Sequence, residues 1–182
     1  MTFQFNQGQE RVINNAVNWF FNSSEQVFQF SGSPGTGKSV VLNEIVNLIS
    51  KKRNIKVAPM AYTGAAAIVM RMKGMPFAKT IHSWLYKCVE EPVFDSYGNP
   101  VMDKYFNVPI TTLKFVPNIE EMNPIDLIII DEGGMVPMEM RDDLLATGKK
   151  ILVAGDIYQI PPITGTPAFL TTGHVEMLTE IM

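Results

Sequence analysis

The sequence predicts an α/β fold in which a parallel sheet is covered by helices on both faces. Short apolar runs of the kind found in buried strands alternate with stretches whose apolar residues recur at helical spacing. A glycine-rich segment at residues 32–39 joins one such strand to the next helix, and an acidic pair directly follows a later strand. The chain has 182 residues, enough for one ordinary domain, so we expect residues 1–182 to form a single domain.

The N-terminal half alternates between helix-forming and strand-forming stretches. Apolar residues of the expected helices fall on one face, whereas the expected strands are short apolar runs. Thr80 is expected to cap a short helix that runs through Tyr86, because a threonine oxygen can accept a hydrogen bond from a free N–H of the first turn. The expected helices are residues 9–22, 37–50 and 65–72, and the expected strands are residues 27–30 and 55–58.

Residues 87–123 differ in character from the rest of the chain. They contain four prolines, and the Tyr-Gly-Asn-Pro turn signal at residues 97–100 is flanked by short β-prone pieces. We therefore expect an inserted β-hairpin here, outside the main sheet.

The regular pattern resumes after the insertion. Residues 127–130 are four apolar residues rich in β-branched side chains, which is typical of a strand buried on both faces. Pro137 can open the next helix and Gly148 can close it. Residues 151–154 then predict another buried strand.

Composition excludes several classes of protein. The chain is 46% hydrophobic and 18% charged, which fits a soluble globular domain. A net charge of -3 excludes a basic coat, so any contact with nucleic acid would be local. The single cysteine, Cys88, excludes an internal disulfide, and no segment resembles a signal peptide or is long enough to span a bilayer. We expect a cytoplasmic protein without a membrane partner.

The glycine-rich segment matches the Gly-x-x-x-x-Gly-Lys-Ser phosphate-binding loop in full. Its glycines allow backbone N–H groups to wrap around phosphates, and the following helix adds its positive N-terminal end. Lys38 can reach the β- and γ-phosphates, and the Ser39 hydroxyl can bind Mg²⁺. The alternative, a glycine-rich turn that binds nothing, fits less well between a strand and a helix. We expect ATP to be bound by the loop residues Gly32, Ser33, Pro34, Gly35, Thr36, Gly37, Lys38 and Ser39.

The acidic pair offers the chemistry that a phosphate loop lacks. Asp131 and Glu132 follow the strand at residues 127–130, and ligands of such sheets bind beyond the carboxyl ends of the strands. Asp131 can hold Mg²⁺ with Ser39, and Glu132 can accept a proton from an attacking water. The alternative is an acidic pair that caps a strand in solvent. Gln159, after the strand at residues 151–154, could orient this water or sense the γ-phosphate, although a Gly-Asp sequence after a strand is more often only a turn.

The order of these motifs resembles the superfamily 1 DNA helicases, especially the 5′-to-3′ class that includes RecD and Dda. The match covers nearly the whole chain except residues 87–123. The sequences Gly-Asp-x-x-Gln-x-Pro-Pro and Thr-Ile-His-Ser make it specific. The matching segments are residues 5–9, 32–39, 61–67, 80–85, 131–134 and 155–162.

The resemblance implies an N-terminal RecA-like motor domain that couples hydrolysis of Mg-ATP to translocation on single-stranded DNA. It implies that Gln9 reads the adenine, and that residues 61–67 (motif Ia) and 80–85 (motif Ib) hold DNA phosphates without reading sequence. Residues 87–123 take the place of a small subdomain that helps to split the duplex. The residues implied in DNA binding are Thr63, Gly64, His82 and Ser83.

The resemblance also implies a partner. In the family, a second RecA-like domain supplies arginines to the ATP site, and arginine fingers are worth roughly 10³–10⁵ in rate in related chemistry. The sequence stops at Met182, before such a domain, so we expect this chain alone to be weak or inactive in hydrolysis. The sequence departs from the family pattern at Tyr62, Ala65 and Gly133-Gly134, where relatives more often carry proline, a basic residue, and alanine with a polar residue.

Several alternatives stay open at this point. The chain could bind nucleotide and DNA without turnover, or it could be another P-loop enzyme such as a nucleotide kinase. His82 could be a helix-start histidine bonded to the backbone, and His174 is expected at the surface. Phe94 and Tyr97 flank the hairpin turn; we expect them to pack the hairpin onto the domain, with a wedge or base-stacking role as the alternative.

Overall fold

The protein is described here by a computed structural model that covers residues 4–158, 166–171 and 173–180. Its core is a six-stranded sheet in the order β3-β2-β6-β7-β1-β8, and every strand pair in it is parallel. The predicted parallel sheet with flanking helices is therefore confirmed. The strands are β1 Val27–Gly32, β2 Val57–Ala61, β3 Lys79–Thr80, β6 Leu127–Asp131, β7 Lys150–Gly155 and β8 Val175–Leu178.

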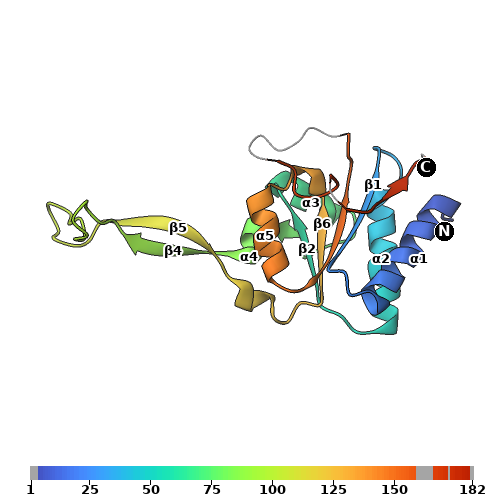
Figure 1. Ribbon diagram of the computed structural model, residues 1–182, viewed down its shortest axis with the longest axis horizontal. Coiled ribbons are helices and arrows are strands. Elements are labelled where there is room, and N and C mark those ends of the chain that lie inside the picture. The colour runs from blue at the N-terminus through green and yellow to red at the C-terminus, as the bar shows by residue number, and fades with distance from the viewer. Residues whose placement is uncertain (1–3, 159–165, 172, 181–182) are drawn as a thin grey trace.

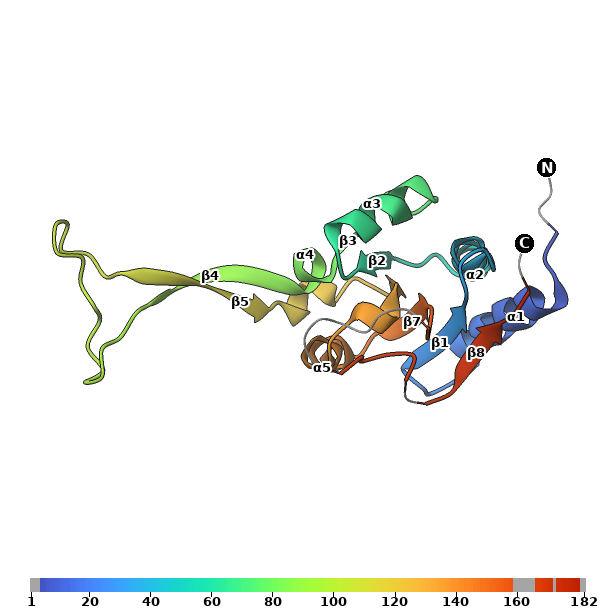
Figure 2. The ribbon, with the colours of Figure 1, turned by 90° about the horizontal axis from the view of Figure 1, so that it is seen from above.

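Helices cover both faces of the sheet and enclose two hydrophobic cores (Figure 2). Leu127 and Ile129 of β6 pack under α1, α2 and α3, whereas Ile128 and Ile130 pack on the face that carries α4 and α5. This alternation explains why the strand is a continuous apolar run in the sequence. The helices are α1 Gln7–Asn22, α2 Lys38–Lys52, α3 Gly64–Met72, α4 Ile81–Leu85 and α5 Met138–Ala146, with 3₁₀ turns at Ile119–Met122 and Gly133–Met135.

The inserted hairpin is present and extends away from the sheet domain (Figure 1). Strand β4 (Tyr86–Pro92) pairs antiparallel with β5 (Thr111–Pro117). The expectation that Phe94 and Tyr97 pack the hairpin onto the domain is wrong, because these residues, which follow the end of β4, are 58% and 88% exposed. The hairpin is held at its root instead, where the Tyr86 hydroxyl donates to Asp143 of α5 at 2.5 Å.

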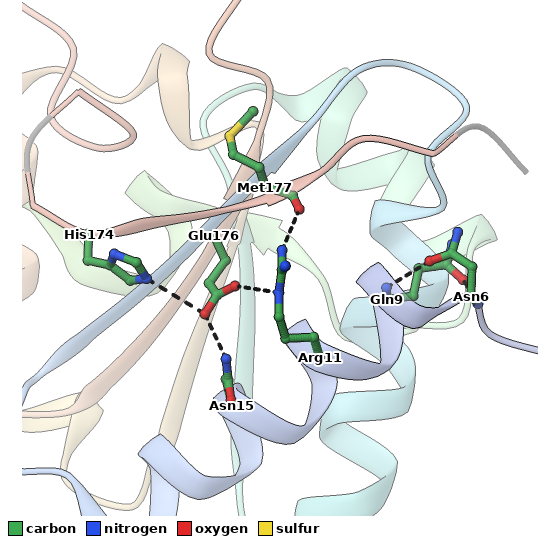
Figure 3. Close-up of polar contacts among 7 residues, drawn as sticks. All are labelled: Asn6, Gln9, Arg11, Asn15, His174, Glu176 and Met177. Carbon is green, nitrogen blue, oxygen red and sulfur yellow. Dashed lines mark hydrogen bonds and ion pairs between the residues drawn. The ribbon is translucent and has the colours of Figure 1, made fainter.

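Strand β8, which the sequence did not predict, is tied to α1 by a polar cluster (Figure 3). Glu176 forms an ion pair with Arg11 at 3.3 Å and accepts a hydrogen bond from Asn15 at 2.8 Å. Arg11 also donates to the Met177 carbonyl at 3.2 Å, and the exposed His174 approaches Glu176 at 3.6 Å. These contacts hold the edge strand of the sheet against the first helix.

Side chains cap the first turns of α1, α3 and α4. Thr80 caps α4 as expected, since its hydroxyl accepts from Ser83 N at 3.1 Å. Helix α5 begins one residue after Pro137, which occupies the N-cap position. None of the helices in the described ranges has the length and apolar character needed to cross a bilayer.

Candidate functional site

The phosphate loop lies between the end of β1 and the start of α2. Gly37, with φ at 82°, occupies the N-cap of α2, a left-handed position that favours glycine. Gly32 allows close approach, because a Cβ there would lie 2.4 Å from Thr36 Oγ1 and 2.9 Å from Leu178 Cβ. Both glycines are therefore required by the fold of the loop.

A pocket of about 560 Å³ opens between this loop and the end of β6. Its volume falls within the range of small-molecule sites. The pocket brings together most of the residues that the sequence singled out for phosphate, metal and proton chemistry. Its lining consists of Pro34, Gly35, Gly37, Lys38, Ser39, Val40, Asn43, Lys73, Asp131 and Glu132.

Lys38 folds back onto the loop that precedes it. Its ammonium donates to the Gly32 carbonyl at 2.6 Å and to the Ser33 carbonyl at 3.3 Å. The ammonium thus has neutral carbonyl partners, which are weaker than the anionic oxygens of a phosphate. Lys38 supports the loop as well as lining the pocket, so its substitution also removes contacts within the protein.

The acidic pair Asp131 and Glu132 does not cap its strand in solvent. Asp131 ends β6 with only 7% of its surface exposed, and it accepts a hydrogen bond from Glu132 N at 3.0 Å. Glu132 has φ at 57°, a left-handed conformation that is strained for a side chain of this kind. Its Oε2 is buried without a hydrogen-bond partner among the described residues. Strain and an unpaired buried carboxylate oxygen at one residue are typical of a functional position.

Burial raises the pKa of Asp131, and the neighbouring Glu132 charge raises it further. The hydrogen bond from Glu132 N and the charges of Lys73 and Lys38 lower this pKa and oppose the shift. The two lysines therefore favour the ionised carboxylate that a metal would need.

Asp131 and Ser39 fit Mg²⁺ by chemistry, because both present oxygen atoms to the same pocket. Within the part of the chain that the structure describes, no group of three or more His, Cys, Asp or Glu side chains could hold a metal by itself. Mg²⁺ typically takes one or two protein carboxylates and completes its shell with phosphates and waters. The donor set therefore suits a metal that arrives with a nucleotide.

Gln9 lies beneath the phosphate loop and does not line the pocket. It forms a capping box with Asn6 at the start of α1, with hydrogen bonds of 2.8 and 3.1 Å (Figure 3). Its side-chain amide also donates to the Thr36 carbonyl at 3.0 Å, and only 1% of the residue is exposed. The structure thus gives Gln9 a role in holding the loop against α1, and adenine reading stays a prediction.

The residues expected to hold DNA gather at the ends of two adjacent strands. Thr63 caps α3 and Gly64 begins that helix, directly after β2. His82 and Ser83 lie in α4, directly after β3, which pairs with β2. Carboxyl ends of parallel strands share one edge of a sheet, so these exposed or half-buried groups face the same side of the domain.

The structure tests the backbone-bonded alternative for His82. The imidazole of His82 contacts the rings of Tyr86 and Phe115, at 5.3 and 6.2 Å between centroids. It makes no hydrogen bond to the backbone of the described residues, so the backbone-bonded alternative does not hold. Gln159 lies outside the described residues.

Lys73 and Asn43 line the pocket but belong to no motif that the sequence analysis used. Lys73 follows the end of α3, and its ammonium donates to Ser39 Oγ at 3.2 Å. The contact spans 34 residues of sequence, so only the packing of α3 beside α2 brings it about. A lysine before Gly74 at a helix end carries no local signal for such a role.

The parallel sheet, the loop between β1 and α2, and the acidic pair at the end of β6 define a P-loop nucleotide-binding domain. A family model described as an AAA domain matches residues 4–181, and the chain belongs to this family.

The relatives of the chain are DNA helicases. The chain is 28% identical over 160 residues to the ATP-dependent DNA helicase RRM3 of Saccharomyces cerevisiae, across 85% of this chain and 20% of that protein. It is 29% identical over 140 residues to the RecBCD enzyme subunit RecD of Buchnera aphidicola, across 73% of this chain and 22% of that subunit. The resemblance to superfamily 1 helicases is thereby confirmed.

A solved relative shares the fold over the whole chain. The Pif1 helicase from Bacteroides in complex with ADP-AlF3 and single-stranded DNA aligns with a TM-score of 0.62 at 22% identity, across 99% of this chain and 43% of that one. The chain thus spans about a fifth of the length of the two curated relatives and less than half of the solved one.

Proposed function

We propose that the chain is the ATP-binding motor domain of a Pif1- or RecD-like DNA helicase, which couples hydrolysis of Mg-ATP to translocation on single-stranded DNA. The observation that carries the proposal is the pocket in which the phosphate loop faces Asp131 and Glu132. Family membership and the helicase relatives support the same assignment.

In this proposal, each pocket residue has a defined task. The loop N–H groups and the N-terminus of α2 bind the phosphates, and Lys38 exchanges its carbonyl partners for anionic phosphate oxygens. Ser39 and Asp131 hold Mg²⁺, which neutralises phosphate charge when it is bound. Glu132 takes a proton from the water whose oxygen attacks the γ-phosphorus, while the bond to the β-phosphate oxygen breaks and ADP leaves. Among the described residues, the buried Oε2 of Glu132 has no hydrogen-bond partner, which supports this task.

The other parts of the motor are proposed by the same comparison. Thr63, Gly64, His82 and Ser83 contact the phosphates of single-stranded DNA, and Gln159 senses the γ-phosphate. Residues 1–182 act as one RecA-like domain, with residues 87–123 as an inserted subdomain. A second RecA-like domain supplies arginines to the ATP site.

The test is binding and hydrolysis of ATP by this chain, with and without single-stranded DNA. Fluorescent ATP measures binding, phosphate release measures turnover, and Lys38→Ala serves as the blank for both. We expect Mg-ATP to bind to the wild type and not to the blank, with slow turnover. Turnover that DNA accelerates supports a motor, whereas wild-type protein that binds ATP no better than the blank contradicts the proposal.

A further inference from the structure

Lys73 places a second ammonium group in the phosphate pocket. It lines the same pocket as Lys38, Asp131 and Glu132, and its Nζ lies 3.2 Å from Ser39 Oγ. The side chain is otherwise exposed. An exposed lysine gains little from a neutral hydroxyl and loses side-chain entropy when it is held, so this contact is a weak one.

The main chain fixes the place of Lys73 independently of its side chain. The carbonyl of Lys73 accepts a hydrogen bond from Asn43 Nδ2 of α2 at 2.5 Å, and its N–H donates to the Val69 carbonyl at 3.1 Å. Gly74, with φ at 105°, follows directly and packs against Asn43, and the next residue, Met75, is buried in the core. The helix that carries Lys38 and Ser39 thus also positions Lys73.

The ammonium of Lys73 lies at the end of the pocket where hydrolysis is proposed to occur. It contacts Ser39, and Asp131 and Glu132 line the same pocket. Ser39 and Asp131 are the residues that would hold Mg²⁺, and Glu132 is proposed to act at the γ-phosphorus. An ammonium on this side therefore lies nearer to a terminal phosphate than to the nucleoside.

We propose that Lys73 is a second cationic phosphate-binding residue, which leaves Ser39 and binds the terminal phosphate of a nucleoside triphosphate. The exchange replaces a neutral acceptor by an anionic one, and it separates the ammonium from a metal ion on Ser39. The proposal rests on the proposed function, since it requires a nucleotide in this pocket. It predicts that Lys73 distinguishes triphosphate from diphosphate.

The experiment compares ATP and ADP binding by four variants at fixed ionic strength in the presence of Mg²⁺. Lys73→Gln removes the charge, Lys73→Arg keeps it, and Lys38→Ala is the blank. Lys51→Gln is the matched control, because Lys51 is an exposed lysine in the last turn of α2, at the other end from the loop. Fluorescence titration gives each Kd, and thermal melting checks that each variant is folded.

We expect Lys73→Gln to weaken the binding of ATP about tenfold, which corresponds to about 1.4 kcal/mol, and the binding of ADP by less than about threefold. Lys73→Arg and Lys51→Gln should stay near the wild type. If the wild type binds ATP and the blank does not, two results overturn the role of Lys73 and leave the proposed function standing. These are an unchanged ATP affinity in Lys73→Gln, or an equal loss of affinity for ATP and ADP. A wild type that fails to bind either nucleotide overturns this role and the proposed function together.

Discussion

Gly133, which follows the acidic pair, is predicted to be intolerant of alanine. The residue is buried in the 3₁₀ turn that packs on β7. An added Cβ would lie 2.2 Å from Val153 Cγ1 and 3.4 Å from the Ala154 carbonyl oxygen. Val153 is fully buried in a central strand, and its β-branched side chain is stiff, so it cannot easily turn away. Gly133→Ala therefore forces a local rearrangement of the core.

The cost follows from the size of the overlap. Carbon atoms pack at about 3.5–4.0 Å, so the 2.2 Å contact is short by more than about 1 Å. Overpacking of this kind typically costs about 1–3 kcal/mol. Alanine gains at most about 1 kcal/mol over glycine in a long helix, and a three-residue turn gives less of this gain. We expect a net loss of about 2 kcal/mol in the free energy of unfolding, or about 4–8 °C in Tm at this chain length.

A double-mutant cycle with Val153→Ala isolates this overlap. Val153→Ala removes Cγ1 and should cost about 1–3 kcal/mol by leaving a cavity, which the Gly133→Ala methyl group can then fill. Urea unfolding of the wild type, both single variants and the double variant gives the coupling. We expect the double variant to be at least as stable as Val153→Ala alone. The reasoning would be refuted if the losses in unfolding free energy of Gly133→Ala and Val153→Ala simply added in the double variant. It would also be refuted if Gly133→Ala were as stable as the wild type.

Three further predictions concern the pocket and its support. Glu132→Gln should keep Mg-ATP binding and lower turnover by about 10²–10⁴, because an amide cannot take a proton; phosphate-release kinetics with normal turnover would exclude Glu132 as the base. Asp131→Asn should raise Tm at neutral pH, because burial disfavours the charged carboxylate. Since the pKa of Asp131 is raised, the difference in Tm between the variant and the wild type should grow as pH rises above about 3.8 and vanish in acid. Melting curves that show the reverse pH trend would contradict this. Gln9→Ala should lower the free energy of unfolding by about 1–3 kcal/mol through loss of the capping box and of the bond to Thr36. Titrations of this variant with ATP and GTP then separate the two roles of Gln9. Loss of loop support should weaken the binding of both nucleotides equally, whereas loss of adenine reading should weaken the binding of ATP alone.

The features that the sequence predicted correctly are those with local signals. The strand before Asp131 is a continuous apolar run, and Thr80 has the side chain that an N-cap needs. The phosphate loop has a fixed spacing of glycines, and the carboxyl ends of the strands follow from the parallel arrangement. These signals were sufficient to bring the loop and the acidic pair into one pocket.

The features that the sequence did not predict depend on contacts between distant segments. Strand β8 is held by Arg11 and Asn15 of the first helix, more than 160 residues away in sequence. The ammonium of Lys38 donates to the Gly32 carbonyl at 2.6 Å, and a motif does not encode which neutral acceptor a cation finds. Lys73 enters the pocket only because α3 ends beside α2, and no pattern around it records that arrangement.

Helix α3 also has a mechanical consequence. Its N-terminal end carries Thr63 and Gly64, two of the four residues proposed to touch DNA, and Lys73, at its far end, is held to α2 through Asn43. Nine residues at a rise of about 1.5 Å make a rod about 13 Å long. A tilt of about 5° around the fastened end would move the Thr63 end by about 1 Å, while Lys73 would stay almost still. The helix is therefore a lever with its pivot at the phosphate pocket, so small rotations there become larger displacements of the groups proposed to touch DNA.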